Sequence, residues 1–359
     1  MRILHMIPDI GISNGVMSVI LNYAKAMPDN IVFDVVYFSE KEKTKQAEIE
    51  ALGGRVFKIS PPSPKSIIKG EINSLFKHHQ GEWQALHIHA PHFTVFIAPY
   101  AKKYGIKKIC CHCHSTWYSL DSHNEKRNKL LAYPAGKLTD KQFACGRDAG
   151  LFWYKNEDSF EVLNNAVDCS KYRFDPQIRN TKRISMELND KFVVGHTGRV
   201  YPPQKNHPFL IKIFAQIKKI KPNAVLLLAG AQKDNNLLSL VKEAGIEDSV
   251  IFLGLRTDID ELLQVMDVFV FPSFKEGLPV SVIEAQAAGL PVLMSDSITN
   301  EVAVTDLVIS MSLNDSAEKW AEKAVEISNG KREDTFEILK QSGWDIFDCA
   351  KRLADYYSE

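Results

Sequence analysis

The chain has 359 residues, with 44 basic side chains, 44 acidic side chains and 45% apolar residues. This length predicts two domains, each with its own core, and the composition excludes disordered, collagenous and low-complexity chains. The longest apolar runs fall far short of the ~20 residues that cross a bilayer, and the start lacks the long apolar core of a secretory signal. Six cysteines without a paired framework indicate a reducing, cytoplasmic setting.

The charges are unevenly distributed along the chain. A net charge of zero argues against a nucleic-acid partner. Residues 1–180 nevertheless carry 24 basic and 18 acidic side chains, whereas residues 181–359 carry 20 and 26. Within residues 90–141 the ratio is 9 to 3. This basic segment suits an anionic lipid or an anionic substrate, and an ordinary solvated surface is the alternative.

In the first half, short β-rich runs alternate with amphipathic stretches. The predicted strands cover residues 2–7, 32–38, 55–59, 85–89, 107–113, 142–145 and 161–163. The predicted helices cover residues 15–27, 44–52, 67–79 and 94–104. Strands that alternate with helices favour a parallel sheet covered on both faces.

The alternation of strands and helices stops at residues 164–190 and then resumes. Strands are predicted at 192–196, 224–229, 250–252, 268–271 and 292–294. Helices are predicted at 208–220, 235–244, 258–265, 280–288, 316–328 and 345–357. The sequence therefore predicts an α/β protein with two doubly wound, Rossmann-like domains, 1–165 and 191–342, joined by a linker region at 166–190. Ligands of such sheets bind at the carboxyl ends of strands, so we expect a site in the cleft between the domains.

The most informative segment follows the predicted strand that ends at Phe271. Gly277 allows the backbone to approach a ligand closely. Pro279 suits the first turn of a helix, where a missing N–H costs nothing. The amides of Leu278 and Val280 would lie at the helix start, and such amides attract phosphate or a cluster of hydroxyls.

The same segment carries two acids with the spacing Glu-x7-Glu, Glu276 in the loop and Glu284 on the helix. Here the chain resembles the family 4 glycosyltransferases of the GT-B fold, which are retaining enzymes that use nucleotide sugars. The sequence departs from the family pattern at Gln286–Ala287. The alternative is a plain strand-loop-helix unit with two solvated glutamates.

The resemblance implies a role for each residue of the segment. Glu276 would contact the hydroxyls of the donor sugar at the reacting face and is the first catalytic candidate. Val280 would lie under the diphosphate, and Glu284 would hold the hydroxyls of the ribose. The remaining donor-sugar candidates are Gly277, Leu278 and Pro279.

A second segment, at the end of the strand 192–196, carries two cations. It matches the family pattern Gly-Arg-x-x-x-x-Lys-Asn at Gly198, Arg199, Lys205 and Asn206, with one extra residue near Pro202–Pro203. Arginine binds oxygens as a bidentate fork and lysine acts as a point charge, so Arg199 and Lys205 suit a diphosphate. A surface turn with two ordinary cations is the alternative.

No motif of the sequence indicates a metal or a resident cofactor. A Walker A loop and a zinc spacing are absent from the sequence, and we predict no Mg-binding Asp-x-Asp pair. Arg199 and Lys205 would then supply the electrostatic stabilisation that a metal gives in other transferases. We therefore expect no metal and no cofactor apart from the nucleotide sugar as co-substrate.

Three further candidates rest on weaker signals. The loop before the helix at 15–27 fails the dinucleotide fingerprint, and either Ser13 or Asn14 is a suitable helix cap. The resemblance places a glycine here opposite the donor phosphates, and Gly15 is the candidate. It also implies a histidine near the donor sugar, for which we choose His114 as a hydrogen-bonding or catalytic group. Arg256 follows a strand end where the family holds the nucleotide base.

The resemblance covers the whole chain and is strongest to bacterial enzymes of capsule, exopolysaccharide and O-antigen synthesis. It implies transfer of a hexosyl unit, with UDP as the favoured nucleotide, to a glycan or a lipid-linked sugar. The basic residues 102–108 and 126–129 would then rest on the inner leaflet of the membrane, and the helix at 343–359 would cross back to the first domain. The alternatives are another sugar-nucleotide enzyme, such as an epimerase or a hydrolase, and a non-catalytic sugar-nucleotide-binding protein.

Overall fold

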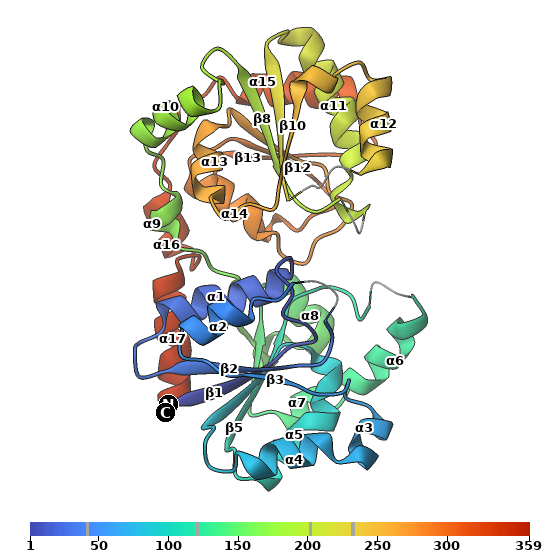
Figure 1. The fold of residues 1–359 in the computed structure, drawn as a ribbon, viewed down its shortest axis with the longest axis vertical. Coiled ribbons are helices and arrows are strands. Elements are labelled where there is room, and N and C mark those ends of the chain that lie inside the picture. Colours follow the sequence, from blue (N-terminus) through green and yellow to red (C-terminus); the bar gives the residue numbers. More distant parts are fainter. Residues whose placement is uncertain (41–42, 120–121, 201–202, 231–233) are drawn as a thin grey trace. The chain divides into compact units, whose positions relative to one another are not determined.

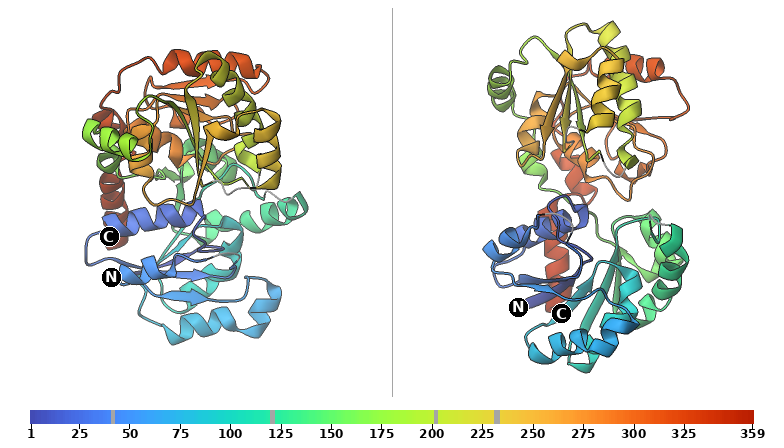
Figure 2. Two further views of the ribbon diagram at one scale, coloured as in Figure 1. Left: turned by 45° about the horizontal axis from the view of Figure 1, so that its top comes forward. Right: turned by 45° about the vertical axis from the view of Figure 1, so that its right-hand side comes forward.

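The computed structural model describes residues 1–40, 43–119, 122–200, 203–230 and 234–359. Contacts within the chain define two compact units (Figures 1 and 2). Unit 1 consists of Met1–Ala166 and Asp345–Glu359, and unit 2 consists of Val167–Trp344. Each unit is built on one parallel sheet, which confirms the predicted α/β class with two doubly wound halves.

Unit 1 contains a seven-stranded sheet in the order β3-β2-β1-β4-β5-β6-β7. Its strands are β1 (Arg2–Met6), β2 (Val32–Tyr37), β3 (Val56–Lys58), β4 (Ala85–Ile88), β5 (Lys108–Cys113), β6 (Lys141–Ala144) and β7 (Glu161–Val162). Its helices are α1 (Gly15–Ala26), α2 (Gln46–Ala51), α3 (Pro64–Lys69), α4 (Glu71–His78), α5 (Thr94–Lys103), α6 (Ser122–Ala132), α7 (Ala135–Leu138), α8 (Arg147–Tyr154) and α17 (Ile346–Ser358), with the short 3₁₀ turns η1 (Pro91–Phe93) and η2 (Glu157–Ser159). The apolar core on one face contains Ile72 and Phe76 of α4 and Ile97 of α5.

The last helix, α17, lies beside α1 on the other face of the same sheet (Figure 1). The hydroxyl of Tyr357 lies 2.6 Å from Nδ1 of His87 on β4. Lys108 at the start of β5 donates to the carbonyl of Tyr356 at 2.7 Å. Residues 345–359 therefore complete the core of the unit that begins at residue 1.

Unit 2 contains a six-stranded sheet in the order β10-β9-β8-β11-β12-β13. Its strands are β8 (Phe192–Thr197), β9 (Ala224–Ala229), β10 (Val250–Gly254), β11 (Val268–Phe271), β12 (Val292–Ser295) and β13 (Val308–Met311). Its helices are α9 (Cys169–Tyr172), α10 (Pro176–Ser185), α11 (His207–Ile220), α12 (Asn235–Glu243), α13 (Ile259–Val265), α14 (Val280–Ala287), α15 (Ala317–Ile327) and α16 (Phe336–Gln341), with η3 (Pro203–Lys205), η4 (Glu247–Ser249) and η5 (Asn300–Val302). The fully buried strand β9 is apolar throughout, as expected for a parallel strand covered on both faces.

The helix predicted over residues 67–79 is wrong as a single element. The structure has two helices here, α3 and α4, and Gly70 lies between them with φ of 74°. This left-handed conformation is open to glycine without strain, and it interrupts the α-helical hydrogen bonding. The apolar spacing of the segment continues across the break, which explains why the pattern predicted one helix.

Residues 166–190, set aside as a linker region, contain α9 and α10, and residues 167–190 belong to unit 2. The carboxylate of Asp175 accepts hydrogen bonds from the amides of Gln177 and Ile178. Pro176 follows as the first helical residue, where it is well tolerated. Asp175 and Pro176 therefore form the start of a helix.

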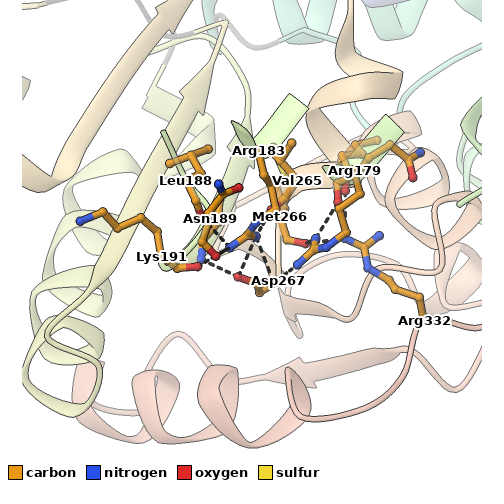
Figure 3. A network of polar contacts seen from close by, with 12 residues as sticks. Arg179, Arg183, Leu188, Asn189, Lys191, Val265, Met266, Asp267 and Arg332 are labelled. Atoms are coloured by element: carbon orange, nitrogen blue, oxygen red, sulfur yellow. Dashed lines mark hydrogen bonds and ion pairs between the residues drawn. The ribbon is translucent and has the colours of Figure 1, made fainter. Parts of the chain in front are cut away.

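A polar network fastens α10 to the sheet of unit 2 (Figure 3). Arg179 donates to the carboxylate of Asp267 at 2.5 Å, and Arg183 lies 3.4 Å from the same carboxylate. Arg183 also donates to the carbonyl of Val265 at 2.7 Å, and Arg332 donates to that of Met266. Guanidinium groups thus donate to carbonyl oxygens at the end of α13. These bonds hold α10 and the segment around Arg332 against the unit 2 sheet.

Candidate functional site

The strand order of unit 2 reverses between β8 and β11. β8 is paired with β9 on one side and with β11 on the other, so the connections that leave these two strands diverge. Ligands of doubly wound sheets bind beside the carboxyl ends of strands at such a reversal. Both predicted motif segments begin at this place, because one follows Thr197 and the other follows Phe271.

The structure brings Lys205 and Glu276 together at this reversal. The ammonium of Lys205 lies 3.0 Å from Oε1 of Glu276, and both side chains are largely buried. The same ammonium lies 4.3 Å from the centre of the Phe271 ring, in cation–π range. An added Cβ on Gly198 would lie 2.8 Å from Cγ of Lys205, so the glycine leaves the space that the lysine stem occupies. The two motif segments therefore form one charged site.

The helix predicted at 280–288 is present and starts at the predicted residue. α14 begins at Val280, and Pro279 is its N-cap residue rather than part of the first turn. The side chain of Leu278 is buried, whereas Gly277 is partly exposed beside Glu276. The first amides of a helix have no intrahelical partner, so the backbone at Val280 offers donors to an anion.

Glu284, on α14, has a partner that the sequence did not reveal. Its Oε1 accepts a hydrogen bond of 2.9 Å from the hydroxyl of Tyr172 on α9. Burial raises the pKa of Glu284, and the bond from Tyr172 acts in the opposite direction. Burial and the neighbouring Glu284 carboxylate also raise the pKa of Tyr172. The two residues are 112 positions apart, and no motif connects them.

Of the two predicted arginines, Arg256 forms an ion pair and Arg199 lies just after the end of a strand. Arg256 forms a bidentate ion pair with Asp258, at 2.7 and 2.6 Å. Its guanidinium is therefore already engaged by a carboxylate two residues away. Arg199 follows Gly198 directly after β8, beside the start of the loop that leads to Lys205. The extra residue expected near Pro202–Pro203 falls partly outside the described residues.

In unit 1, both ring nitrogens of His114 already have protein partners. Its Nδ1 lies 3.0 Å from Oδ1 of Asn165, and its Nε2 lies 2.9 Å from Nδ1 of His89. Nε2 of His89 in turn lies 2.9 Å from Nδ1 of His5. Burial lowers the pKa of His114 to about 4, so the ring is neutral at pH 7. A hydrogen bond to a sugar, as predicted, would have to replace one of these two contacts.

Five histidines of β1, β4, β5 and the residues just after these strands form a stack. They are His5, His87, His89, His112 and His114. In two triplets among the described residues, ring nitrogens lie within 4.8 Å of one another. The rings of His87 and His89 are inclined by only 8°, and the other ring pairs within the triplets by 17° to 35°. The 2.9 Å contacts of His89 with His5 and with His114 join three of these rings in a hydrogen-bonded chain.

Gly15 is the first residue of α1, and its cap is one of the two predicted residues. Oδ1 of Asn14 accepts the hydrogen bond from the amide of Met17 at 3.0 Å. An added Cβ on Gly15 would meet no atom of the described structure within 4 Å. Packing within unit 1 therefore does not require a glycine there, and its predicted role toward a ligand stays a prediction.

Proteins similar to this chain in sequence are glycosyltransferases. A profile of the family described as "Glycosyl transferases group 1" matches residues 191–329. The putative glycosyltransferase EpsF of Bacillus subtilis is 31% identical over 376 aligned positions, which cover 99% of this chain and 96% of EpsF. The chain therefore belongs to the group 1 glycosyltransferases, and this confirms the predicted family and enzyme class.

Solved structures give the same fold. The crystal structure of Anabaena Alr3699/HepE in complex with UDP and glucose matches with a TM-score of 0.82 at 18% identity, over the full length of both chains. Sucrose-phosphate synthase from Thermosynechococcus elongatus matches with a TM-score of 0.77 at 16% identity, over 99% of this chain and 98% of that one. The predicted GT-B architecture is thus confirmed. In the parts of the chain that the structure describes, no helix combines the length and apolar character that crossing a bilayer requires.

Proposed function

We propose that this glycosyltransferase moves a hexosyl unit from a nucleoside diphosphate sugar, with UDP as the favoured nucleotide, to a hydroxyl of a glycan or lipid-linked sugar. The observation that supports this most directly is the Lys205–Glu276 pair at the reversal of the unit 2 sheet. A cation there stabilises the departing diphosphate as its charge grows, and the acid beside it accepts hydrogen bonds from sugar hydroxyls. Glu284, eight residues after Glu276, is placed to accept bonds from the ribose.

We propose a retaining reaction that requires no divalent metal. Arg199 and Lys205 supply the positive charge, and the helix start at Val280 adds backbone donors. A relative from Escherichia coli, 31% identical over 40% of this chain and 38% of its own length, is named a UDP-Gal:alpha-D-GlcNAc-diphosphoundecaprenol alpha-1,3-galactosyltransferase. That name supports a polyprenyl-linked sugar as the acceptor to be tested first. We also propose a role in surface polysaccharide synthesis.

A screen of nucleotide sugars followed by a transfer assay tests this function. UDP-, GDP- and ADP-sugars are compared by thermal shift, and the best donor is then incubated with and without a polyprenyl diphosphate-linked sugar, in the presence of EDTA. We expect transfer that depends on the acceptor, survives EDTA and keeps the anomeric configuration in the NMR spectrum of the product. Donor hydrolysis at the same rate without acceptor would instead indicate a hydrolase.

Two matched variants test the site itself. Glu276→Gln keeps the size of the side chain and removes its charge, and Glu247→Gln makes the same change at an exposed position of unit 2. We expect Glu276→Gln to lower kcat at least 100-fold, a loss of ~3 kcal/mol in transition-state stabilisation, whereas Glu247→Gln stays active. Full turnover by folded Glu276→Gln would exclude Glu276 from the reaction.

We also propose that unit 1 contacts an anionic membrane surface through residues 102–108 and 126–129. On and after α6, Leu130 is 74% exposed and Tyr133 is 82% exposed, close to Lys126 and Lys129. Exposed apolar side chains among lysines suit the boundary between lipid headgroups and acyl chains. Sedimentation with phosphatidylglycerol vesicles should fall when Lys126 and Lys129 are changed to Glu, and should not fall for Lys212→Glu on α11. Equal binding of both variants would contradict this assignment.

A further inference from the structure

Among the described residues, two buried hydroxyls at the reversal of the unit 2 sheet have no hydrogen-bond partner. Ser273 is completely buried, and its Oγ makes no hydrogen bond within the described residues. Oγ1 of Thr197, the last residue of β8, is likewise buried and unpartnered there. A buried polar group without a partner costs about 1–3 kcal/mol, so such groups in native proteins call for an explanation.

The strand register relates Thr197 to Phe271, whose ring centre lies 4.3 Å from the ammonium of Lys205. β8 and β11 are paired with Val194 opposite Val268 and Gly195 opposite Phe269. The same offset sets Thr197 opposite Phe271, and His196 continues the register by contacting the carbonyl of Val270. Residues that face each other across a ladder share a side of the sheet, and so do residues two apart along a strand.

The ring of Phe271 lies under the ammonium of Lys205, and Ser273 follows two residues later on the way to Glu276. Thr197 stands next to Gly198, whose missing side chain admits the lysine stem. The two hydroxyls thus lie on the two chain segments that hold the Lys205–Glu276 pair.

The charged residues around Lys205 favour neutral groups as additional hydrogen-bond donors to a phosphate. Glu276 already offsets the charge of Lys205 at 3.0 Å. The two nearby imidazoles, His196 and His207, are buried, and their pKa values lie below 6.5 because burial disfavours the charged ring. Hydroxyl groups donate hydrogen bonds to phosphate oxygens without adding a buried charge.

We infer that Ser273 and Thr197 are ligands of the donor diphosphate, each donating its hydroxyl to a phosphate oxygen beside Lys205. This inference rests on the proposed function and deepens it, because it adds two neutral donors to the charged residues. It also explains why the free protein keeps two buried hydroxyls unpartnered, since the bound nucleotide satisfies them.

Isosteric variants separate a ligand-directed hydroxyl from a structural one. We compare Ser273→Ala and Thr197→Val with the control Ser295→Ala, because Ser295 is also fully buried but its Oγ accepts from the amide of Ser297 at 3.0 Å. Free-state stability is measured by urea unfolding, and the Kd values for UDP and for uridine are measured by calorimetry. GDP or ADP with its nucleoside replaces UDP if wild type binds that nucleotide instead.

We expect Ser273→Ala and Thr197→Val to keep or raise the stability of the free protein, since each removes an unpartnered group. Each should weaken UDP binding about 10-fold, the loss of one hydrogen bond to a charged group, and leave uridine binding unchanged. Ser295→Ala should show the reverse, with lower stability and unchanged UDP affinity. Wild-type UDP affinity in both variants, or an equal loss for uridine, would overturn the inference. Failure of wild type to bind any of the three nucleotides would instead overturn the proposed function.

Discussion

The position of Lys205 depends on the absence of a side chain at Gly198. A methyl group there would lie 2.8 Å from Cγ of the lysine, well inside contact distance. The stem of a lysine is flexible, so it can move aside at small cost, but its ammonium then leaves Glu276 and the Phe271 ring. Gly198 therefore leaves space for the side chain of Lys205, in addition to any effect on the conformation of the backbone.

Gly198→Ala should reproduce much of the effect of Lys205→Met. We expect UDP binding about 10-fold weaker than in wild type, with the free energy of unfolding changed by less than ~1 kcal/mol. Gly330→Ala is the control, because its new Cβ would meet only ordinary contact at 3.7 Å. Calorimetry and urea unfolding measure both quantities. Unchanged UDP affinity in Gly198→Ala would show that Lys205 can adopt another side-chain conformation that keeps its ammonium beside Glu276.

The hydrogen bond from Tyr172 lowers the pKa of the Glu284 carboxyl, against the effect of its burial. In Tyr172→Phe this hydrogen bond is lost, so the pKa of Glu284 rises further. A protonated carboxyl is a poorer acceptor for ribose hydroxyls, and protonation increases as the pH falls. UDP affinity of the variant should therefore fall more steeply than that of wild type between pH 8.5 and pH 6. Tyr133→Phe, at an exposed position, serves as the control, and parallel pH profiles would contradict the role of Tyr172.

At the scale of helices and strands, single residues determine where a helix ends and where the next one begins. Gly70 ends one helix and begins another because it adopts φ of 74°. Gly70→Ala should cost about 1 kcal/mol of unfolding free energy, since alanine is strained in that conformation. Gly136→Ala, inside α7 and with open space around its Cβ, should be neutral or slightly stabilising. Urea unfolding compares the two, and equal effects would show that the break at Gly70 does not rely on its conformation.

Most strands and helices could be predicted because apolar periodicity is a local property of the sequence. The predictions missed α6, α7 and α8 in unit 1 and β13 in unit 2. The charged sequence of α6 has no apolar stripe to reveal a helix. The site was predicted where its residues lie within one motif, such as Glu276 to Glu284. Tyr172, the partner of Glu284, could not be predicted, because only the packing of α9 against α14 brings it there.

At the scale of the whole molecule, buried histidines make stability dependent on pH. Burial lowers the pKa of His5 to about 3 and those of His114 and His207 to about 4, below the unfolded value near 6.5. The unfolded chain therefore binds more protons as the pH falls below 6.5. The stability from neutral rings is fully present above that pH and is lost toward pH 4, by up to ~1.4 kcal/mol per pH unit for each ring.

Urea unfolding between pH 8 and pH 4.5 should show this loss, with a plateau above pH 7. His112→Leu removes one protonatable ring from the stack and should reduce the slope below pH 6.5, provided that circular dichroism shows a folded protein. His78→Gln, at an exposed position, should leave the slope unchanged. A flat profile for wild type would mean that these rings take up protons in the folded protein as readily as in the unfolded chain.

The chain completes unit 1 with residues that follow the whole of unit 2. During synthesis, the ribosome must therefore release residues 167–344 before α17 can cover the histidine face of the first sheet. By then all strands and helices of unit 2 have been synthesised, so unit 2 can reach its native fold first. Until α17 is released, one face of the unit 1 sheet lacks that helix. The core of the first unit therefore cannot be complete before the second unit has been translated.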